Sequence, residues 1–239
     1  MQRSLVGSEM CIRDSWGMSG TGIASKVTYT DYTINSIKVS LMTVVLVVLF
    51  TSMSAYCFQR GNFPGRKFLY WLFMATMFIG AGTVTMFPLL RITTKLGLNN
   101  LPGLALVQFG TAGASDLFLT MGYLKTISKE LDDAAKIDGC SFFSTWWRVI
   151  LPLSKPICSV IAIFAINAAW SDFLLPYLVL RGSALQTVMV RLFVFSTEQT
   201  VNADTMMRSV VFSMIPPIIL FFIFQKQLTE NAVSVGIKG

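Results

Sequence analysis

Long apolar runs without basic residues dominate this sequence and restrict what it can fold into. Five of them occupy residues 39–58, 68–90, 101–124, 156–180 and 210–224. A helix rises about 1.5 Å per residue, so about 20 apolar residues cross the hydrocarbon core of a membrane. The sequence therefore predicts an all-α membrane protein with five spans, of which the last is short.

The composition excludes several classes of protein. Hydrophobic residues make up 54% of the chain and charged residues 13%, against about 25% charged in soluble domains. The 19 Lys and Arg residues are scattered in short loops, which argues against a nucleic-acid partner. The chain has no histidine and its four cysteines form no CxxC pair. We therefore expect no enzyme, no catalytic residue, no metal site and no disulfide framework.

Basic residues in the loops predict the orientation of the spans. Arg60, Arg66 and Lys67 lie between the first two runs, whereas Arg91 and Lys95 are the only basic residues of the next loop. Cytoplasmic loops are enriched in Lys and Arg, so the first of these loops is predicted to be cytoplasmic. Alternation then places residues 125–156 in the cytoplasm and 181–208 outside. An external segment before the first run needs an earlier span to carry it across.

The first fifteen residues do not look native. Glu9, Arg13 and Asp14 interrupt any apolar run, so the stretch is no secretory signal. Residues 4–14 look like the conceptual translation of a transposase adapter used to prepare sequencing libraries. We expect residues 1–15 to be an artefact joined to an open reading frame, with one transmembrane domain over residues 16–239.

The loop at residues 125–156 carries the functional signal and is predicted to form two short helices. The first begins near Ser128, with acids in its first turn that complement the helix dipole: Glu130, Asp132 and Asp133. Gly139 ends it in a left-handed conformation. Ser141 starts an aromatic second helix that Pro152 closes. A loop with this many apolar residues needs to be covered. Either a partner protein covers it, or it lies at the membrane interface without any partner.

A spaced signature runs through this loop. Asp133-Ala134-Ala135 is followed after three residues by Gly139, after nine more by Val149, and after one more by Leu151-Pro152. All these intervals resemble the Glu-Ala-Ala signature of the permease subunits of ATP-binding-cassette (ABC) importers. Asp133 replaces the usual Glu and Val149 the usual Ile. The resemblance implies that these seven residues form the loop that couples the permease to an ATPase.

The resemblance extends along most of the chain. Its further motifs are "NFPGRK" at 62–67, "RVILPLSKP" at 148–156, "WSDFLLPYLVL" at 170–180 and the terminal "GIKG". They are similar to the second, maltose-type permease of carbohydrate importers. That family implies a type I importer transmembrane domain of six spans, so the first span is missing here. It also implies a multi-pass protein of the bacterial or archaeal inner or plasma membrane.

The same resemblance implies the partners. They are two ABC ATPase subunits, a second permease and an extracytoplasmic solute-binding protein that delivers a sugar or a sugar-like solute. "GNFPGRKF" at residues 61–68 lacks the spacing of a phosphate-binding loop. We therefore expect no cofactor in this chain, with ATP bound by the partner ATPase.

Two acids inside predicted spans leave an alternative open. Asp116 and Asp172 could be the coupling carboxylates of an ion-coupled secondary transporter, since intramembrane acids are often functional. No inverted repeat relates them. In the permease interpretation Asp172, with Asn167 and Trp170, is a candidate for the translocation path, although Asp172 could instead cap a helix end.

Overall fold

The computed structural model describes residues 29–78, 85–111, 114–180, 185–197, 207, 210–211, 213–219 and 222. These residues form helices and connections, without a strand among them. The all-α prediction is therefore confirmed. The predicted leader at 1–15, the external segment around Asn202 and the terminal "GIKG" lie outside the described residues.

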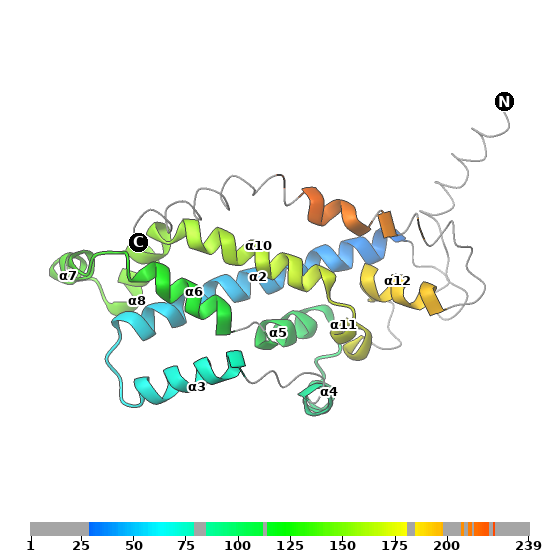
Figure 1. Ribbon diagram of the computed structural model, residues 1–239, viewed down its shortest axis with the longest axis horizontal. Helices are drawn as coiled ribbons and strands as arrows, with labels where there is room; N and C mark the ends of the chain where they lie inside the picture. The colour runs from blue at the N-terminus through cyan, green and yellow to red at the C-terminus, as the bar shows by residue number, and fades with distance from the viewer. Residues whose placement is uncertain are drawn as a thin grey trace. The chain divides into compact units, whose positions relative to one another are not determined.

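The chain divides into two compact units, each made of segments distant in sequence. The first comprises Met1–Met42, Met86–Gln108 and Asn167–Leu220, and the second comprises Thr43–Thr85, Phe109–Ile166 and Phe221–Gly239. The long helices α2 (Tyr29–Arg60) and α10 (Lys155–Ser171) contribute residues to both. Figure 1 labels these two helices and most of the shorter ones.

Helix α2 is the clearest membrane span. Thr30–Arg60 is long and apolar enough to cross a membrane, which confirms the run predicted at 39–58. Asp31 in its first turn and Arg60 in its last complement the helix dipole. Among the described residues it is the one continuous helix of this kind, and counting two bent helix pairs raises the number to three. The total of five spans therefore stays a prediction.

The first unit packs short helices around a small apolar core. Its elements besides α2 are α4 (Met86–Lys95), α5 (Leu101–Thr111, mostly within this unit), α11 (Leu174–Val179) and α12 (Val188–Thr197). The core gathers α2, α5 and α11 through Val39, Leu104, Ala105, Val107, Leu175, Val179 and Leu180. The Val188 N–H donates to Ser36 Oγ at 2.9 Å, so α12 is tied to the beginning of α2.

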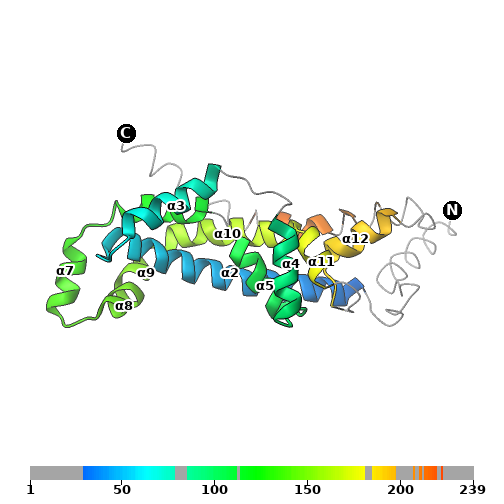
Figure 2. The same cartoon turned by 90° about the horizontal axis from the view of Figure 1, so that it is seen from below.

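The second unit contains the candidate loop. Its elements are α3 (Arg66–Phe78), α6 (Ala114–Leu124), α7 (Glu130–Ile137), α8 (Phe142–Thr145), a π-helical turn (Trp146–Ile150), α9 (Leu151–Leu153) and most of α10. Helix α3 lies against α6. Helix α7 lies against α8 (Figure 2). A core of Ala55, Tyr56, Phe58, Leu117, Met121, Leu124, Trp146 and Ile150 joins α2 and α6 to the loop.

Three predicted runs do not form single described helices. The run at 156–180 is not one continuous helix, because α10 ends at Ser171 and α11 begins at Leu174. The run at 68–90 contains α3 and the start of α4, with residues 79–84 outside the described part. The run at 101–124 contains α5 and α6, with residues 112–113 outside it. Of the run at 210–224, residues 210–211, 213–219 and 222 are described, all as helix.

The break at Asp172 has a local cause. Its Oδ1 accepts hydrogen bonds from the Leu174 N–H at 3.1 Å and the Leu175 N–H at 3.3 Å. A carboxylate that satisfies the first free N–H groups of a helix begins a new helix rather than extending the old one. The acid that interrupts the apolar run therefore also sets where α11 starts.

Candidate functional site

The loop at residues 125–156 forms the two helical segments predicted from its sequence. The first is α7, Glu130–Ile137, and Ser128 Oγ accepts from the Glu130 N–H at 3.2 Å just before it. The second begins with α8 after Ser141, whose Oγ accepts from the Ser144 N–H at 3.3 Å. Serine hydroxyls at these positions supply the acceptors that helix beginnings lack.

Gly139 ends α7 in the left-handed conformation that its sequence predicts. Its φ is 76°, a region that residues with a Cβ rarely adopt. Its N–H donates to the Lys136 carbonyl at 3.0 Å, and the Cys140 N–H donates to the Ala135 carbonyl at 2.9 Å. This pair of bonds is a Schellman motif. It fixes the turn between the two helical segments.

The second segment differs from prediction near Pro152. It continues to Leu153 through α9, so Pro152 does not close it. A π-helical turn at Trp146–Ile150 precedes α9, and the Leu151 N–H donates to the Trp146 carbonyl five residues back. Proline has no N–H and clashes with the carbonyl four residues before it, and a wider turn relieves that clash. The chain then bends by 81° between this segment and α10.

One face of α7 is buried against α2. Asp132 is 5% exposed and Ala135 is also 5% exposed. Asp132 Oδ2 lies 3.0 Å from Arg60 Nε, and its Oδ1 accepts from the Tyr56 hydroxyl at 2.9 Å. Arg60 Nη2 also donates to the Ile127 carbonyl at 2.6 Å. Arg60 begins the first loop that is predicted to be cytoplasmic, and Asp132 lies in the second, at residues 125–156. These two loops therefore contact each other.

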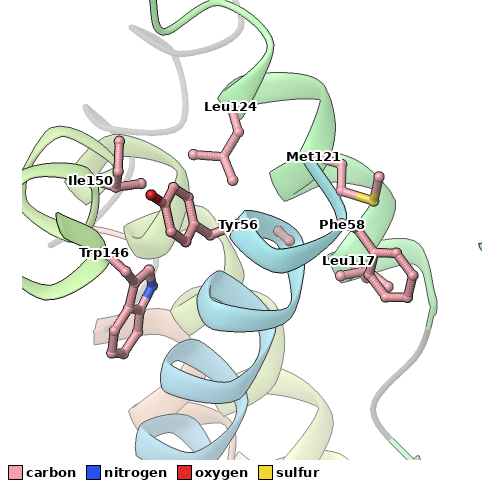
Figure 3. Close-up of a cluster of buried hydrophobic side chains, with 8 residues drawn as sticks. Tyr56, Phe58, Leu117, Met121, Leu124, Trp146 and Ile150 are labelled. Carbon is pink, nitrogen blue, oxygen red and sulfur yellow. The ribbon is translucent and has the colours of Figure 1, made fainter. Parts of the chain in front are cut away.

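Tyr56 is the central residue of this contact. Figure 3 shows its ring on the side of α2 that faces Trp146 and Ile150, whereas Phe58 points toward α6. The Tyr56 ring also lies against Phe142, with 4.5 Å between ring centroids. Both helical segments of the loop thus rest on one buried aromatic side chain of α2.

The opposite face of α7 is exposed. Ile137 is 87% exposed and Leu131 is 41% exposed, and Ala134 between them is exposed as well. Beside them Lys136 Nζ donates to Asp133 Oδ1 at 2.9 Å, with both side chains more than two thirds exposed. This hydrogen bond and the positive charge of Lys136 lower the pKa of the Asp133 carboxyl below its usual value.

The structure thus divides the signature residues between two surfaces. Asp133 and Ala134 are exposed, Ala135 is buried, and Val149 and Leu151 pack half-buried against the core around Tyr56. Sequence reasoning missed Tyr56, Arg60 and Ile137 as members of this site. Only Ile137 carried a signal, because it follows Ala134 by three residues on one face of a helix.

The candidate path residues have different environments. Trp170 is buried and its Nε1 donates to the Ser213 carbonyl at 3.1 Å. Asp172 caps α11, and its Oδ2 accepts from Gln108 Nε2 at 3.2 Å. Asn167 is exposed. Asp116 belongs to the other unit, in the first turn of α6.

Comparison with known proteins identifies the class of the chain. Residues 48–232 match the family described as "Binding-protein-dependent transport system inner membrane component". The chain belongs to this family. It is therefore an importer permease, and the matched range includes the whole candidate loop. The secondary-transporter alternative gains no support from this match.

Several permeases are similar over most of their length. The probable starch degradation products transport system permease AmyC of Thermoanaerobacterium thermosulfurigenes is 30% identical, over 85% of this chain and 74% of its own. The arabinooligosaccharides transport system permease AraQ of Halalkalibacterium halodurans is 32% identical, over 86% and 73%.

A solved structure supports the fold. It is a bacterial ABC transporter involved in the import of the acidic polysaccharide alginate, with a TM-score of 0.73, 21% identity and 94% of each chain covered. At this identity the similarity shows the fold alone. The predicted importer fold is therefore confirmed.

Proposed function

We propose that this permease imports a sugar or sugar-like solute and that the exposed face of α7 couples it to a partner ATPase. The family description includes dependence on a binding protein, and the similar permeases carry names that refer to starch degradation products and arabinooligosaccharides. We infer an oligosaccharide as the class of substrate. An extracytoplasmic binding protein delivers it.

The observation that carries the coupling role is the two-faced character of α7. Its inner face is fixed to the protein by Asp132 and Ala135. Its outer face presents Leu131, Ala134 and Ile137 at intervals of three residues, which form one stripe along a helix. Ile137 lies outside the apolar spans and is 87% exposed, so a partner that covers it lowers the free energy of the complex. The small Ala134 in the middle lets a groove approach the helix backbone closely.

The partners follow from this assignment. Two ATPase subunits receive α7 and the matching loop of a second permease in the cytoplasm, and they bind the ATP. The protein lies in the plasma membrane of a bacterium or archaeon as a multi-pass subunit. When the ATPases close on nucleotide, the loops move and the spans rock from inward-open to outward-open, a rigid-body change. Hydrolysis resets them.

Three residues are candidates for lining the path of the solute: Asn167, Trp170 and Asp172. Of the three candidates Asn167 has the exposed polar side chain that a sugar contact needs. Trp170 and Asp172 make internal hydrogen bonds, so we propose that they hold the wall of the path in shape. Their part in solute binding is indirect in this proposal.

Ile137→Asp tests the coupling face. Burying an isoleucine side chain contributes about 1.5–3 kcal/mol, which corresponds to a roughly 10- to 150-fold weaker ATPase association, since 1.4 kcal/mol is a factor of ten. The variant is measured in liposomes with a full-length permease, the second permease, the ATPases and the binding protein. We expect it to lose sugar uptake and substrate-stimulated ATP hydrolysis together.

The control is Ile137→Leu, which keeps an apolar side chain of the same volume and should retain both activities. Because Ile137 is almost fully exposed, the unfolding temperature of the isolated permease should not change in either variant. Full uptake and full stimulation by Ile137→Asp would show that α7 is not the coupling element.

A further inference from the structure

We propose that Asp132, Arg60 and Tyr56 form a latch that seats α7 on the end of α2, and that these three are positioning residues for coupling. The proposal rests on the proposed function of α7 as the ATPase-coupling helix. It adds that force on this helix is transmitted to α2 through a defined set of buried polar contacts.

The latch uses both oxygens of one carboxylate. Asp132 Oδ1 accepts from the Tyr56 hydroxyl at 2.9 Å, and Oδ2 lies 3.0 Å from Arg60 Nε. The side chains of Asp132 and Arg60 are 7% and 11% exposed. Arg60 Nη2 donates to the Ile127 carbonyl at 2.6 Å, in the chain just before α7. Helix α7 and the segment leading into it are therefore held by the same guanidinium group.

Tyr56 and Arg60 are four residues apart, so they lie on one face of the last turns of α2. The Tyr56 ring also contacts Phe142 of α8. The helices on both sides of the Gly139 turn are thus attached to one turn of one span. A movement of α7 is therefore transmitted to α2 through direct contacts, and not only through the Gly139 turn and α8.

A second ion pair on the same helix differs from the latch in its exposure to water. Asp133 and Lys136 are paired at 2.9 Å, but their side chains are 68% and 69% exposed. Exposed pairs contribute little because water screens them and the side chains lose entropy. Removing one partner of a buried pair leaves an uncompensated charge, which is far more costly. Replacing Asp132 by a neutral residue therefore leaves Arg60 as an uncompensated buried charge, whereas the same change at the exposed Asp133 does not.

The expected consequence of an open latch is loss of coupling rather than loss of the subunit. The apolar core around Tyr56 and the Schellman turn still connect the loop to the rest of the unit. The outer face of α7 stays intact, so the ATPases still dock. Their closure then rotates α7 partly without moving α2, and ATP is hydrolysed without transport.

The test measures ATP hydrolysed per sugar transported, in liposomes containing the complete complex with full-length permease. Asp132→Asn removes the charge with little change of shape, and Tyr56→Phe removes one hydrogen bond while keeping the ring. We expect a several-fold higher ratio in Asp132→Asn and a smaller rise in Tyr56→Phe. Asp132→Glu, which keeps the charge, should stay near the original ratio.

Glu130→Gln is the matched control. It makes the same change from acid to amide on the same helix, at an exposed position, and should leave the ratio unchanged. The double variant of Asp132→Asn and Tyr56→Phe should show less than the sum of the single effects, because the two groups share one contact. Co-purification of the ATPases with each variant reports whether the complex assembles.

Unchanged ratios in Asp132→Asn and Tyr56→Phe, with complexes assembled, overturn the latch. An equal rise in Glu130→Gln overturns it as well. If Asp132→Asn does not assemble, Tyr56→Phe decides, because it removes no charge. The two proposals can fail separately. Full coupled transport by Ile137→Asp refutes the coupling face. Loss of uptake and stimulated hydrolysis in Ile137→Asp, together with unchanged ratios of ATP to sugar in the latch variants, refutes only the latch.

Discussion

Gly139→Val is the most direct perturbation of the turn between the two helical segments of the loop. The residue has a φ of 76°, and an added Cβ meets no atom within 4 Å. The added Cβ itself therefore collides with no neighbouring residue. Its cost is conformational, because a side chain in the left-handed region comes too close to the following carbonyl oxygen.

The magnitude follows from that single cause. The left-handed conformation costs an ordinary residue roughly 1–2 kcal/mol, which weakens the turn by a factor of about 5–30, since 1.4 kcal/mol is tenfold. The cost of the left-handed conformation is highest for valine, because it is β-branched. It is lower for alanine and lower still for asparagine. The order of damage should be Gly139→Val, then Gly139→Ala, then Gly139→Asn. No atom of a span lies within 4 Å of the added Cβ, so we expect the spans to insert normally.

Hydrogen exchange at the Cys140 amide measures the turn itself, because that N–H donates to the Ala135 carbonyl in the Schellman motif. Its protection should fall about 5- to 30-fold in Gly139→Val. Sugar uptake and substrate-stimulated ATP hydrolysis of the rebuilt complex should fall together. Solute affinity of the isolated binding protein should not change.

Gly122→Ala is the control for the loss of a glycine. Gly122 is exposed on α6, has no positive φ, and also has open space for a Cβ. In a helix this change should stabilise by about 0.5–1 kcal/mol and leave transport unaffected. Unaltered Cys140 protection with full coupled transport in Gly139→Val would refute the reasoning that the left-handed turn positions α7.

Two further predictions concern topology and the start of α11. A cysteine introduced at Asn62 should react with a membrane-impermeant thiol reagent only from the cytoplasmic side and one at Asn202 only from outside; the reverse pattern contradicts the orientation. Asp172→Ala removes the acceptor for the Leu174 and Leu175 N–H groups and for Gln108. It should lower the free energy of unfolding by about 1–2 kcal/mol, whereas Asp172→Asn, which retains an acceptor, should cost less. Equal unfolding temperatures for the three proteins would show that the cap contributes nothing.

The loop was the part of this protein most accessible from sequence. Ser128, Gly139 and Ser141 act on neighbours within a few residues, through caps and a left-handed turn, so their effect does not depend on the rest of the fold. The structure confirms the two-segment form for this reason. The π-helical turn before Pro152 was not anticipated, because a proline can end a helix or widen its preceding turn, and packing around Trp146 and Ile150 accompanies the second outcome.

The apolar runs established that the chain is a helical membrane protein, since the need to satisfy backbone groups in lipid leaves helices as the solution for such runs. They did not establish where each helix ends. The run at 156–180 reads as one span, yet Asp172 starts a new helix there by accepting from the Leu174 and Leu175 N–H groups. A single acid in an apolar run can cap a helix or line a path, and the bond from Gln108, far away in sequence, is a contact that no local pattern contains.

What the sequence by itself determined is the class of the protein and the position of the two-helix loop at residues 125–156 with its turn, because hydropathy and helix signals are local properties of the chain. Only the tertiary structure decided which face of α7 is buried. Three neighbouring acids stand in its first turn, and Asp132 alone of them is buried, because Tyr56 and Arg60 approach it from a helix more than seventy residues earlier. Burial and pairing of a charge depend on what lies opposite it in space, and the order of residues along α7 does not carry that information.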